Sequence, residues 1–296
     1  MTPSRPQKST IVRARNAARL LAFRTADLLA PRVAGRLARD LWFRVPPAPA
    51  ATALPAGGEA FSVVSRGTTV RGHVYGAGPT VYLVHGWGGR STQFAELVAP
   101  LVAAGRRVVL FDAPSHGDSD AGVGGPRHTH GVEMGQALDA VFARFGPAEA
   151  VVAHSLGTLA TYLTLRFGWL GTERLALVAP MVEAGSYFDR FQAALGFGDR
   201  TRRAFDREVE ELVGIPVGEF DALVQAAHVD PVPTLVVHDL EDRQTPHAGA
   251  RRLVDGLPDA RLVTTTGLGH RRILRDPTVI AEVVGFVTGG RRAAVA

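Results

Sequence analysis

From residue 59 onward, short apolar segments alternate with amphipathic ones, and this alternation restricts the fold more than any other feature of the sequence. Apolar runs rich in valine and leucine occur at 81–84, 107–111, 150–153, 175–178, 234–237 and 261–264. Helical patterns separate most of them, at 93–104, 132–145, 156–167, 247–257 and 278–287. Such a pattern is typical of a mostly parallel sheet that is covered by helices on both faces. We therefore expect an α/β fold, with an antiparallel hairpin of two earlier strands, 61–64 and 69–75, at one edge.

Two regions interrupt the alternation and set the predicted domain boundaries. Residues 182–232 are helical in pattern and rich in aromatic side chains, which suits a helical cap over a pocket, and for most of these rings we expect packing within the cap itself. Residues 46–58 form a Pro- and Ala-rich linker. The α/β core then comprises 59–181 and 233–296, and residues 1–45 form a separate extension.

This N-terminal extension is basic and amphipathic. Residues 1–45 hold ten basic side chains against two acidic ones, whereas the rest of the chain is slightly acidic. Pro31 is suited to begin a second helix within it. Apolar side chains recur every four residues along one predicted helical face: Leu29, Val33, Leu37 and Leu41. Residues 10–44 are therefore expected to pack on the protein's own domain, to form a homodimer, or to dock peripherally on an anionic membrane.

The composition excludes several classes of protein and site. The chain has no cysteine, which rules out disulfides, thiolate catalysis and cysteine-bound metals. No uncharged apolar run of about 18 residues occurs, so no membrane span is expected, and the predicted location is the cytoplasm or the membrane periphery. The basic charge comes without a nucleic-acid recognition motif, so nucleic-acid binding is not expected. His116, His128 and His130 lack an acidic partner at metal-binding spacing, and no metal is expected.

The strongest functional signal is a serine at a corner between a strand and a helix. The strand predicted at 150–153 runs directly into the next helix through Ala153-His154-Ser155-Leu156-Gly157. Small residues two positions before and after the serine permit a sharp turn, which lifts the hydroxyl off the end of the sheet. The N-terminus of the following helix favours negative charge that develops at this hydroxyl.

A second strand ends in a glycine-rich loop, His85-Gly86-Trp87-Gly88-Gly89. Glycine allows the backbone to approach a bound molecule closely. A backbone N–H of this loop, together with the N–H that follows Ser155, can bind an oxyanion. We expect Gly86 and Trp87 to contact the substrate, with the indole ring of Trp87 at the border of the pocket.

A serine that attacks a carbonyl carbon needs a base to accept its proton and an acid to orient that base. Asp242 follows the strand predicted at 234–237, and His270 follows the strand predicted at 261–264. Both lie at carboxyl ends of strands, where parallel sheets place their sites. Asp239 and Glu241 lie in the same loop as Asp242 and are alternative acids.

A fourth motif follows the strand predicted at 107–111 and reads Asp112-Ala113-Pro114-Ser115-His116-Gly117-Asp118-Ser119. With these four motifs, residues from about 59 to 290 resemble the α/β-hydrolase-fold superfamily, in its serine hydrolase or esterase type with a short helical cap. The resemblance implies Ser155 as nucleophile, His270 as general base and acid, and Asp242 as its orienter. It also implies an oxyanion hole made by the backbone N–H groups of Trp87 and Leu156. Three residues depart from the commoner glycine: Ala153, Ser115 and Asp239.

The function that this resemblance implies is cleavage of a small-molecule carboxylic ester or thioester through an acyl-enzyme, without a cofactor. The same fold also serves acyltransferases, lactonases, amidases and C–C bond hydrolases, and the fold alone does not choose among them. A non-catalytic binding module that keeps the pocket is the alternative from another class.

Overall fold

The computed structural model describes residues 8–48, 50 and 52–289, which fall into two units. The larger unit comprises Arg44–Glu183 and the chain from Glu219 onward. The smaller, which we call the helical unit, comprises the chain up to Phe43 together with Ala184–Gly218. Of the predicted segments, residues 1–7 of the extension, Pro49 and Ala51 of the linker, and 290–296 of the core lie outside the described residues.

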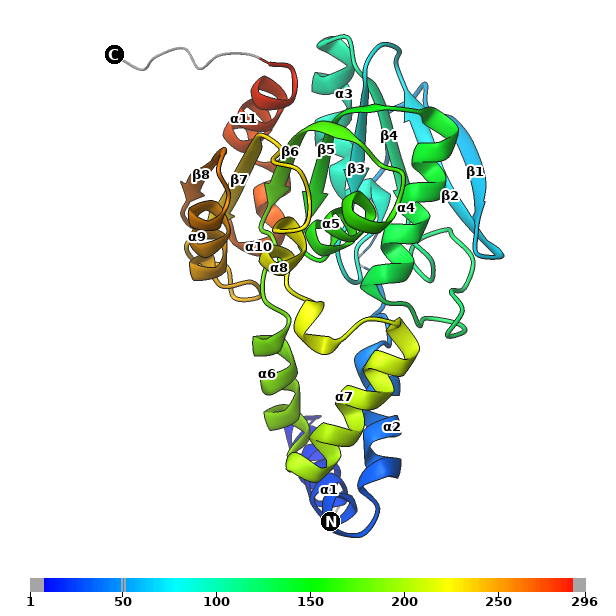
Figure 1. Ribbon diagram of the computed structural model, residues 1–296, viewed down its shortest axis with the longest axis vertical. Helices are drawn as coiled ribbons and strands as arrows, with labels where there is room; N and C mark the ends of the chain where they lie inside the picture. Colours follow the sequence, from blue (N-terminus) through cyan, green and yellow to red (C-terminus); the bar gives the residue numbers. More distant parts are fainter. Residues whose placement is uncertain (1–7, 49, 51, 290–296) are drawn as a thin grey trace, which may run out of the picture. The chain divides into compact units, whose positions relative to one another are not determined.

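The larger unit contains one eight-stranded sheet with the order β1-β2-β4-β3-β5-β6-β7-β8 (Figure 1). The hairpin β1–β2 and the β2–β4 pair are antiparallel, and every other neighbouring pair is parallel. The prediction of a mostly parallel sheet with an antiparallel edge is therefore confirmed. The strands are β1 (Glu59–Ser65), β2 (Thr68–Tyr75), β3 (Thr80–Val84), β4 (Arg107–Asp112), β5 (Ala148–His154), β6 (Thr172–Val178), β7 (Thr234–Asp239) and β8 (Ala260–Thr265).

Helices cover both faces of this sheet, because its central strands are apolar on both sides. Successive side chains of a strand point to opposite faces. Tyr82 and Val84 of β3 accordingly pack in the core beneath α4, α5 and α9, while Val81 and Leu83 pack in the core beneath α3 and α11. The helices and helical turns of the larger unit are η1 (Ser91–Phe94), α3 (Ala95–Ala103), α4 (Gly131–Phe145), α5 (Gly157–Phe167), α8 (Ala222–Ala226), α9 (His247–Gly256), α10 (Gly269–Arg272), η3 (Ile273–Arg275) and α11 (Pro277–Val287). The turn η2 (Val217–Glu219) spans the boundary between the two units in the sequence.

The helical unit is built from two parts of the chain that are far apart in sequence: α1 (Lys8–Leu29) and α2 (Pro31–Trp42) from the start, and α6 (Gly185–Leu195) and α7 (Asp199–Val213) from the middle. Pro31 begins α2, as predicted. Glycine at position 35 lets α2 approach α7 closely, since a Cβ there would lie 2.7 Å from the Cβ of Ala204. The carboxylate of Asp27 accepts the N–H of Thr201 at 2.8 Å, in the first turn of α7.

Aromatic rings from both parts of the chain fill the core of the helical unit. The ring of Trp42 lies 4.5 Å from that of Phe188 and 5.1 Å from that of Phe191, measured between centroids. Phe205 packs against the same group. The rings of the insertion do pack together, but Trp42 of the N-terminal segment completes their core. The predicted extension 1–45 and the predicted cap 182–232 therefore share one core here, and α8 belongs to the larger unit.

The predicted linker is held to the larger unit near both of its ends. Val45 is buried, its N–H donates to the carbonyl oxygen of Arg127 at 2.7 Å, and its own carbonyl accepts from the Arg127 guanidinium at 2.9 Å. Near the other end, the hydroxyl of Tyr75 donates to the carbonyl oxygen of Pro55 at 3.0 Å. The segment thus leads into β1 along fixed contacts.

Candidate active site

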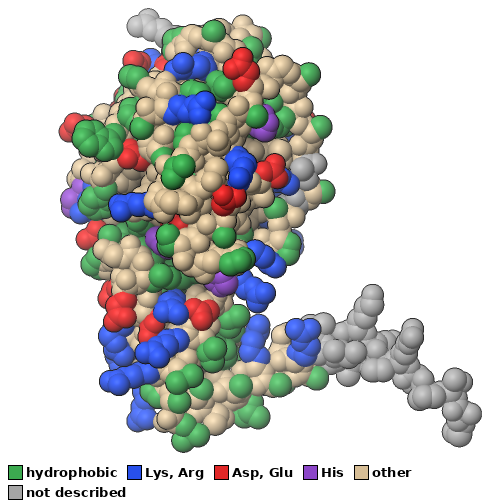
Figure 2. Space-filling model, turned by 90° about the vertical axis from the view of Figure 1, so that its right-hand side faces the viewer, with side chains coloured by type: hydrophobic (Ala, Val, Ile, Leu, Met, Phe, Trp, Pro, Cys, Tyr) green, Lys and Arg blue, Asp and Glu red, His purple; other side chains and the backbone are tan. Residues whose placement is uncertain are grey.

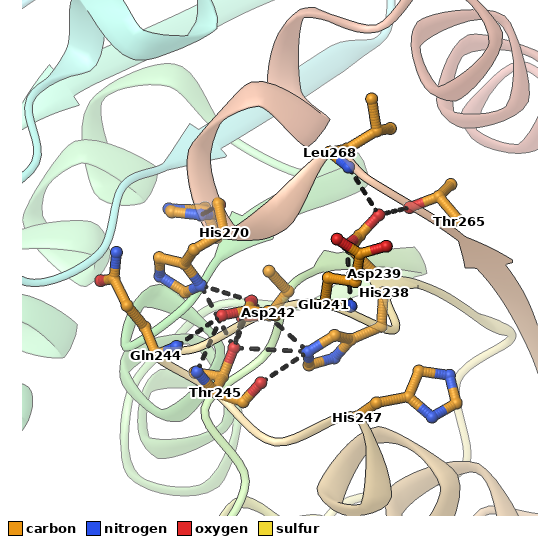
Figure 3. Close-up of polar contacts among 12 residues, drawn as sticks. His238, Asp239, Glu241, Asp242, Gln244, Thr245, His247, Thr265, Leu268 and His270 are labelled. Carbon is orange, nitrogen blue, oxygen red and sulfur yellow. Dashed lines mark hydrogen bonds and ion pairs between the residues drawn. The ribbon is translucent and has the colours of Figure 1, made fainter.

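An imidazole and a carboxylate meet in the loops that follow β7 and β8. The Nδ1 atom of His270 lies 2.7 Å from Oδ2 of Asp242, and the two side chains are 7% and 0% exposed (Figure 3). A histidine that donates through Nδ1–H presents Nε2 as an acceptor when it is neutral. The structure therefore brings together the two residues that the sequence assigns as base and acid.

Asp242 is held as a carboxylate by several donors. Its Oδ2 accepts from the hydroxyl of Thr245 at 2.7 Å and lies 3.5 Å from Nε2 of His238, while Oδ1 accepts the N–H of Gln244 at 2.7 Å. Burial on its own raises the pKa of Asp242, but the hydrogen bonds from His238 and His270 outweigh it and bring that pKa well below its ordinary value. The negative charge beside His270 is thus fixed in place and orientation.

The alternative acid Asp239 has a different role. It is fully buried, and its Oδ2 accepts the N–H of Leu268 at 2.9 Å and the hydroxyl of Thr265 at 2.8 Å. Its Oδ1 accepts the N–H of Glu241 at 3.0 Å, and Glu241 itself is exposed. Asp239 therefore ties the end of β7 to the segment that leads into His270, and this explains why aspartate stands where glycine is commoner.

Ser155 occupies a strained turn between β5 and α5. Its φ is +53°, in the left-handed region that non-glycine residues rarely adopt. The backbone around it is held on both sides: the Ser155 N–H donates to the carbonyl of Val178 at 3.2 Å, and the Ser155 carbonyl accepts the N–H of Met181 at 3.1 Å. Strained residues of this kind persist only where the surroundings enforce them, and they cluster at functional sites.

The sequence departures around the turn have local explanations. The positive φ falls on Ser155, so Ala153 stays in regular strand geometry within the core and needs no glycine. Gly157 is required, because a Cβ there would lie 2.5 Å from the carbonyl oxygen of Val84. Ser115 does adopt a positive φ of 62°, and its hydroxyl donates to the carbonyl of His128 at 2.8 Å, which secures the loop.

His154 joins the serine turn to the histidine loop. Its Nε2 lies 2.9 Å from the backbone oxygen of His270, and its Nδ1 lies 3.2 Å from Nε2 of Gln93. Burial lowers the pKa of His154 to about 3, so the ring is neutral, donating through Nε2–H and accepting at Nδ1. Within the described residues, the side-chain hydrogen bonds of His270 go to Asp242 and Thr245, and none joins it to the Ser155 hydroxyl.

The glycine-rich loop lies against the serine turn. A Cβ on Gly86 would lie 2.7 Å from the Cβ of Ser155 and 3.2 Å from the backbone nitrogen of Leu156, so only glycine permits this approach. The Trp87 side chain packs with that of Leu156 against a small buried cluster that includes Met134. The structure thus places Gly86 and Trp87 next to the turn with which they are expected to act.

Two buried histidines connect this loop to the segment 112–119. A hydrogen bond of His85 within its own loop is expected from the sequence and is present, between Nδ1 and the carbonyl of Gly86 at 2.8 Å, but the bonds between the two motifs were not deduced. Nε2 of His116 accepts the N–H of Gly88 at 3.0 Å, and Nε2 of His85 accepts the N–H of Ala113 at 2.9 Å. Burial lowers the pKa of His116 to about 3 and also lowers that of His85, so both rings accept as neutral groups. The sequence did contain a signal for this role, because each of the two glycine-containing motifs, 85–89 and 112–119, follows a strand and carries one histidine.

His130 starts a helix. Nδ1 of His130 accepts the N–H of Glu133 at 3.2 Å, which caps α4. Burial lowers the pKa of His130 to about 4. In the part of the chain that the structure describes, no three His, Cys, Asp or Glu side chains gather so that they could hold a metal ion.

The chain is similar to known proteins over most of its length. The profile of the Alpha/beta hydrolase family matches residues 81–283. The structure is similar to an esterase from Exiguobacterium antarcticum, with 18% identity, a TM-score of 0.58, and coverage of 76% of this chain and 98% of that chain. It is also similar to a putative lipase from Acinetobacter baumannii AYE, with 18% identity, a TM-score of 0.61, and coverage of 79% and 92%. At these identities the likeness shows the fold alone. No curated protein matches the chain.

Proposed function

Because the chain belongs to the alpha/beta hydrolase family, we propose that it cleaves a small-molecule carboxylic ester or thioester through an acyl-enzyme on Ser155. The observation that carries this proposal is the buried hydrogen bond between Asp242 and His270, placed in a loop that His154 ties to the serine turn. A buried carboxylate with a lowered pKa beside an imidazole is the arrangement that general-base activation of a hydroxyl requires.

In the proposed reaction, Nε2 of His270 accepts the Ser155 proton while the serine oxygen attacks the carbonyl carbon. Asp242 keeps the Nδ1–H tautomer of His270 and stabilises the imidazolium that forms. His270 then protonates the leaving alcohol or thiol, and water hydrolyses the acyl-enzyme by the same route. The hydrogen bond from Ser155 to His270 is expected to form when substrate binds, since catalytic hydrogen bonds are often long in unliganded enzymes.

Negative charge on the carbonyl oxygen would be stabilised by the backbone N–H groups of Trp87 and Leu156. The close approach of Gly86 to the Leu156 nitrogen supports this assignment, because it brings the loop and the start of α5 within reach of one oxygen atom. One such donor is worth roughly 2.7–4 kcal/mol of transition-state stabilisation.

A fluorophosphonate probe tests whether Ser155 is an activated nucleophile. We expect labelling of the full-length chain that disappears in Ser155→Ala and in His270→Ala, while Ser62→Ala, at an exposed serine of β1, labels as the wild type does. Folding of each variant is checked by circular dichroism. Absence of labelling in the folded wild-type protein would favour the non-catalytic binding module.

The substrate class is tested separately, with a chain-length series of p-nitrophenyl esters beside thioester, lactone and amide substrates. The proposal predicts the highest kcat/KM for an ester or thioester. A higher kcat/KM for a lactone or an amide would reassign the reaction, and faster product formation with an added alcohol acceptor would indicate an acyltransferase.

A further inference from the structure

The helical unit exposes large apolar side chains on α1 and α2. Within the described residues, no helix has the length and apolar character needed to cross a membrane. Six leucine and valine side chains of these two helices are nevertheless between 42% and 80% exposed. We call them the apolar stripe: Leu21, Leu28, Leu29, Val33, Leu37 and Leu41.

The stripe is not needed for the core of the helical unit. That core is built from other faces of the same helices, where Phe23, Ala34 and Ala38 are buried and Gly35 approaches α7. Each helix is therefore apolar on two sides, and only one of them is covered. An exposed apolar patch of this kind on a folded protein marks a contact surface.

The charge of the two helices that carry the stripe is mainly positive. The helices α1 and α2 carry eight basic side chains and two acidic ones. On the inner side, Arg39 pairs with Glu208 at 2.7 Å, and Arg36 pairs with the same carboxylate. The outer arginines are exposed, and no carboxylate of the described residues lies within ion-pairing distance of them: Arg13, Arg15, Arg19, Arg24 and Arg32.

The helical repeat places Arg24 directly beside the stripe. Residues three and four apart are neighbours on a helix surface. Arg24 follows Leu21 by three positions and precedes Leu28 by four, so it lies between them. Figure 2 shows hydrophobic and basic side chains next to each other on the surface of the helical unit.

We propose that the outer face of α1 and α2 docks on an anionic lipid bilayer. The stripe enters the boundary between acyl chains and headgroups, and the arginines extend their guanidinium groups to the lipid phosphates. The excess of positive charge favours this occupant over a second copy of the chain. A twofold contact through this face would set unpaired arginines against unpaired arginines, and like charges across an interface are costly.

Vesicle sedimentation tests the proposal independently of the proposed chemistry. The full chain carrying Ser155→Ala is used, so that lipid cleavage cannot alter the vesicles. We expect binding to vesicles of phosphatidylglycerol and phosphatidylcholine in equal parts, weak binding to phosphatidylcholine alone, and weaker binding as salt is raised. Each arginine near an anionic surface contributes about fivefold in affinity, so Arg15→Gln with Arg24→Gln lowers binding roughly 25-fold.

The apolar contribution is tested with Leu28→Ser and Leu29→Ser, which together should lower binding at least tenfold, at roughly 0.8 kcal/mol per buried CH₂. All four substitutions are at exposed positions, so the urea midpoint should not move. The matched control is Val64→Ser with Arg251→Gln, an exposed apolar and an exposed basic side chain of the larger unit.

Three results would overturn the proposal. The first is binding to neutral vesicles that is as strong as binding to anionic vesicles. The second is a loss of binding in the control variant that is as large as the loss in the variants of α1. The third is a concentration-dependent dimer of the wild-type chain that the variants of α1 abolish in sedimentation without vesicles, which would make this face a contact between two copies.

Discussion

The Nε2 atom of His154 lies 2.9 Å from the backbone carbonyl oxygen of His270. This hydrogen bond connects the residue before the proposed nucleophile with the proposed general base, although the two are far apart in the chain. Nε2 of Gln93 reaches the other nitrogen of the same ring at 3.2 Å, so a neutral imidazole bridges η1, β5 and α10. His154 therefore acts as a positioning residue whose ring fixes the backbone of His270.

The first prediction concerns this bridge. His154→Ala leaves the buried His270 carbonyl and the Gln93 amide without their partner, which costs about 1–3 kcal/mol of stability. We also expect kcat on a p-nitrophenyl ester to fall by about tenfold or more with little change in KM, because the base is misplaced and not the substrate. His154→Gln keeps a donor near the Nε2 position and should restore part of kcat. Equal kcat in His154→Ala and the wild type would refute the positioning role.

A second prediction separates the two aspartates of the β7 loop. Asp242→Asn should lower kcat by about 10⁴-fold, the loss that the equivalent change causes in a serine protease, because the imidazole tautomer is wrong. Asp239→Asn removes a buried acceptor of the Leu268 amide, so it should lower the urea midpoint and reduce kcat less than tenfold. If Asp239→Asn loses activity as severely as Asp242→Asn, the acid is misassigned.

The third prediction is a loss of stability in mild acid. Burial lowers the pKa of His116 and His154 to about 3 and that of His130 to about 4, from an ordinary value of 6.5. Between about pH 6.5 and 4 the unfolded chain binds more protons than the folded protein, so stability falls as pH falls through this window. Each histidine contributes up to about 1.4 kcal/mol per pH unit, and the full stability is present above pH 6.5.

Urea unfolding at a series of pH values measures this slope. His130→Asn supplies a matched control, because asparagine keeps an acceptor for the N–H of Glu133 but does not titrate. Below pH 6.5, the free energy of unfolding of this variant should depend less steeply on pH than that of the wild type. The difference should be up to about 1.4 kcal/mol per pH unit, which corresponds to one proton. An unchanged slope would show that His130 protonates equally in the folded and unfolded states.

A fourth prediction tests the contact between α2 and α7. Gly35→Val forces a side chain against Ala204. We expect this overpacking to lower the free energy of unfolding by about 1–3 kcal/mol. The displaced helices should change the fluorescence of Trp42, measured with Trp87→Phe and Trp169→Phe in the background. Gly185→Val, at an open glycine of α6, should leave the fluorescence as it is. A shift of the same size in both variants would argue against the close contact.

The sheet was predictable because each strand is encoded by its own short stretch of sequence. Apolar runs such as 234–237 identify buried strands without knowledge of their neighbours, and β7 (Thr234–Asp239) appears there. Ser155, Asp242 and His270 were proposed in the same way, from their places at strand ends. The bridge through His154 was not predictable, because it depends on which nitrogen of a buried ring faces a carbonyl in a distant loop.

The helical unit shows the other limit of sequence analysis. Apolar residues along one face of a helix indicate that this face can be covered, but they do not indicate which segment covers it. Trp42 and Phe188 belong to segments that look self-sufficient, one a basic extension and the other an aromatic insertion. Their 4.5 Å ring contact arises only when the two segments fold together.

The split origin of the helical unit also has a consequence for biosynthesis. The segments that form α1 and α2 are translated long before those that form α6 and α7. Roughly 150 residues separate Trp42 from its aromatic partners. At ordinary elongation rates this delay is on the order of ten seconds. During this delay the inner faces of α1 and α2 lack the partners that cover them in the folded protein, so the helical unit cannot complete its core until α7 has been made.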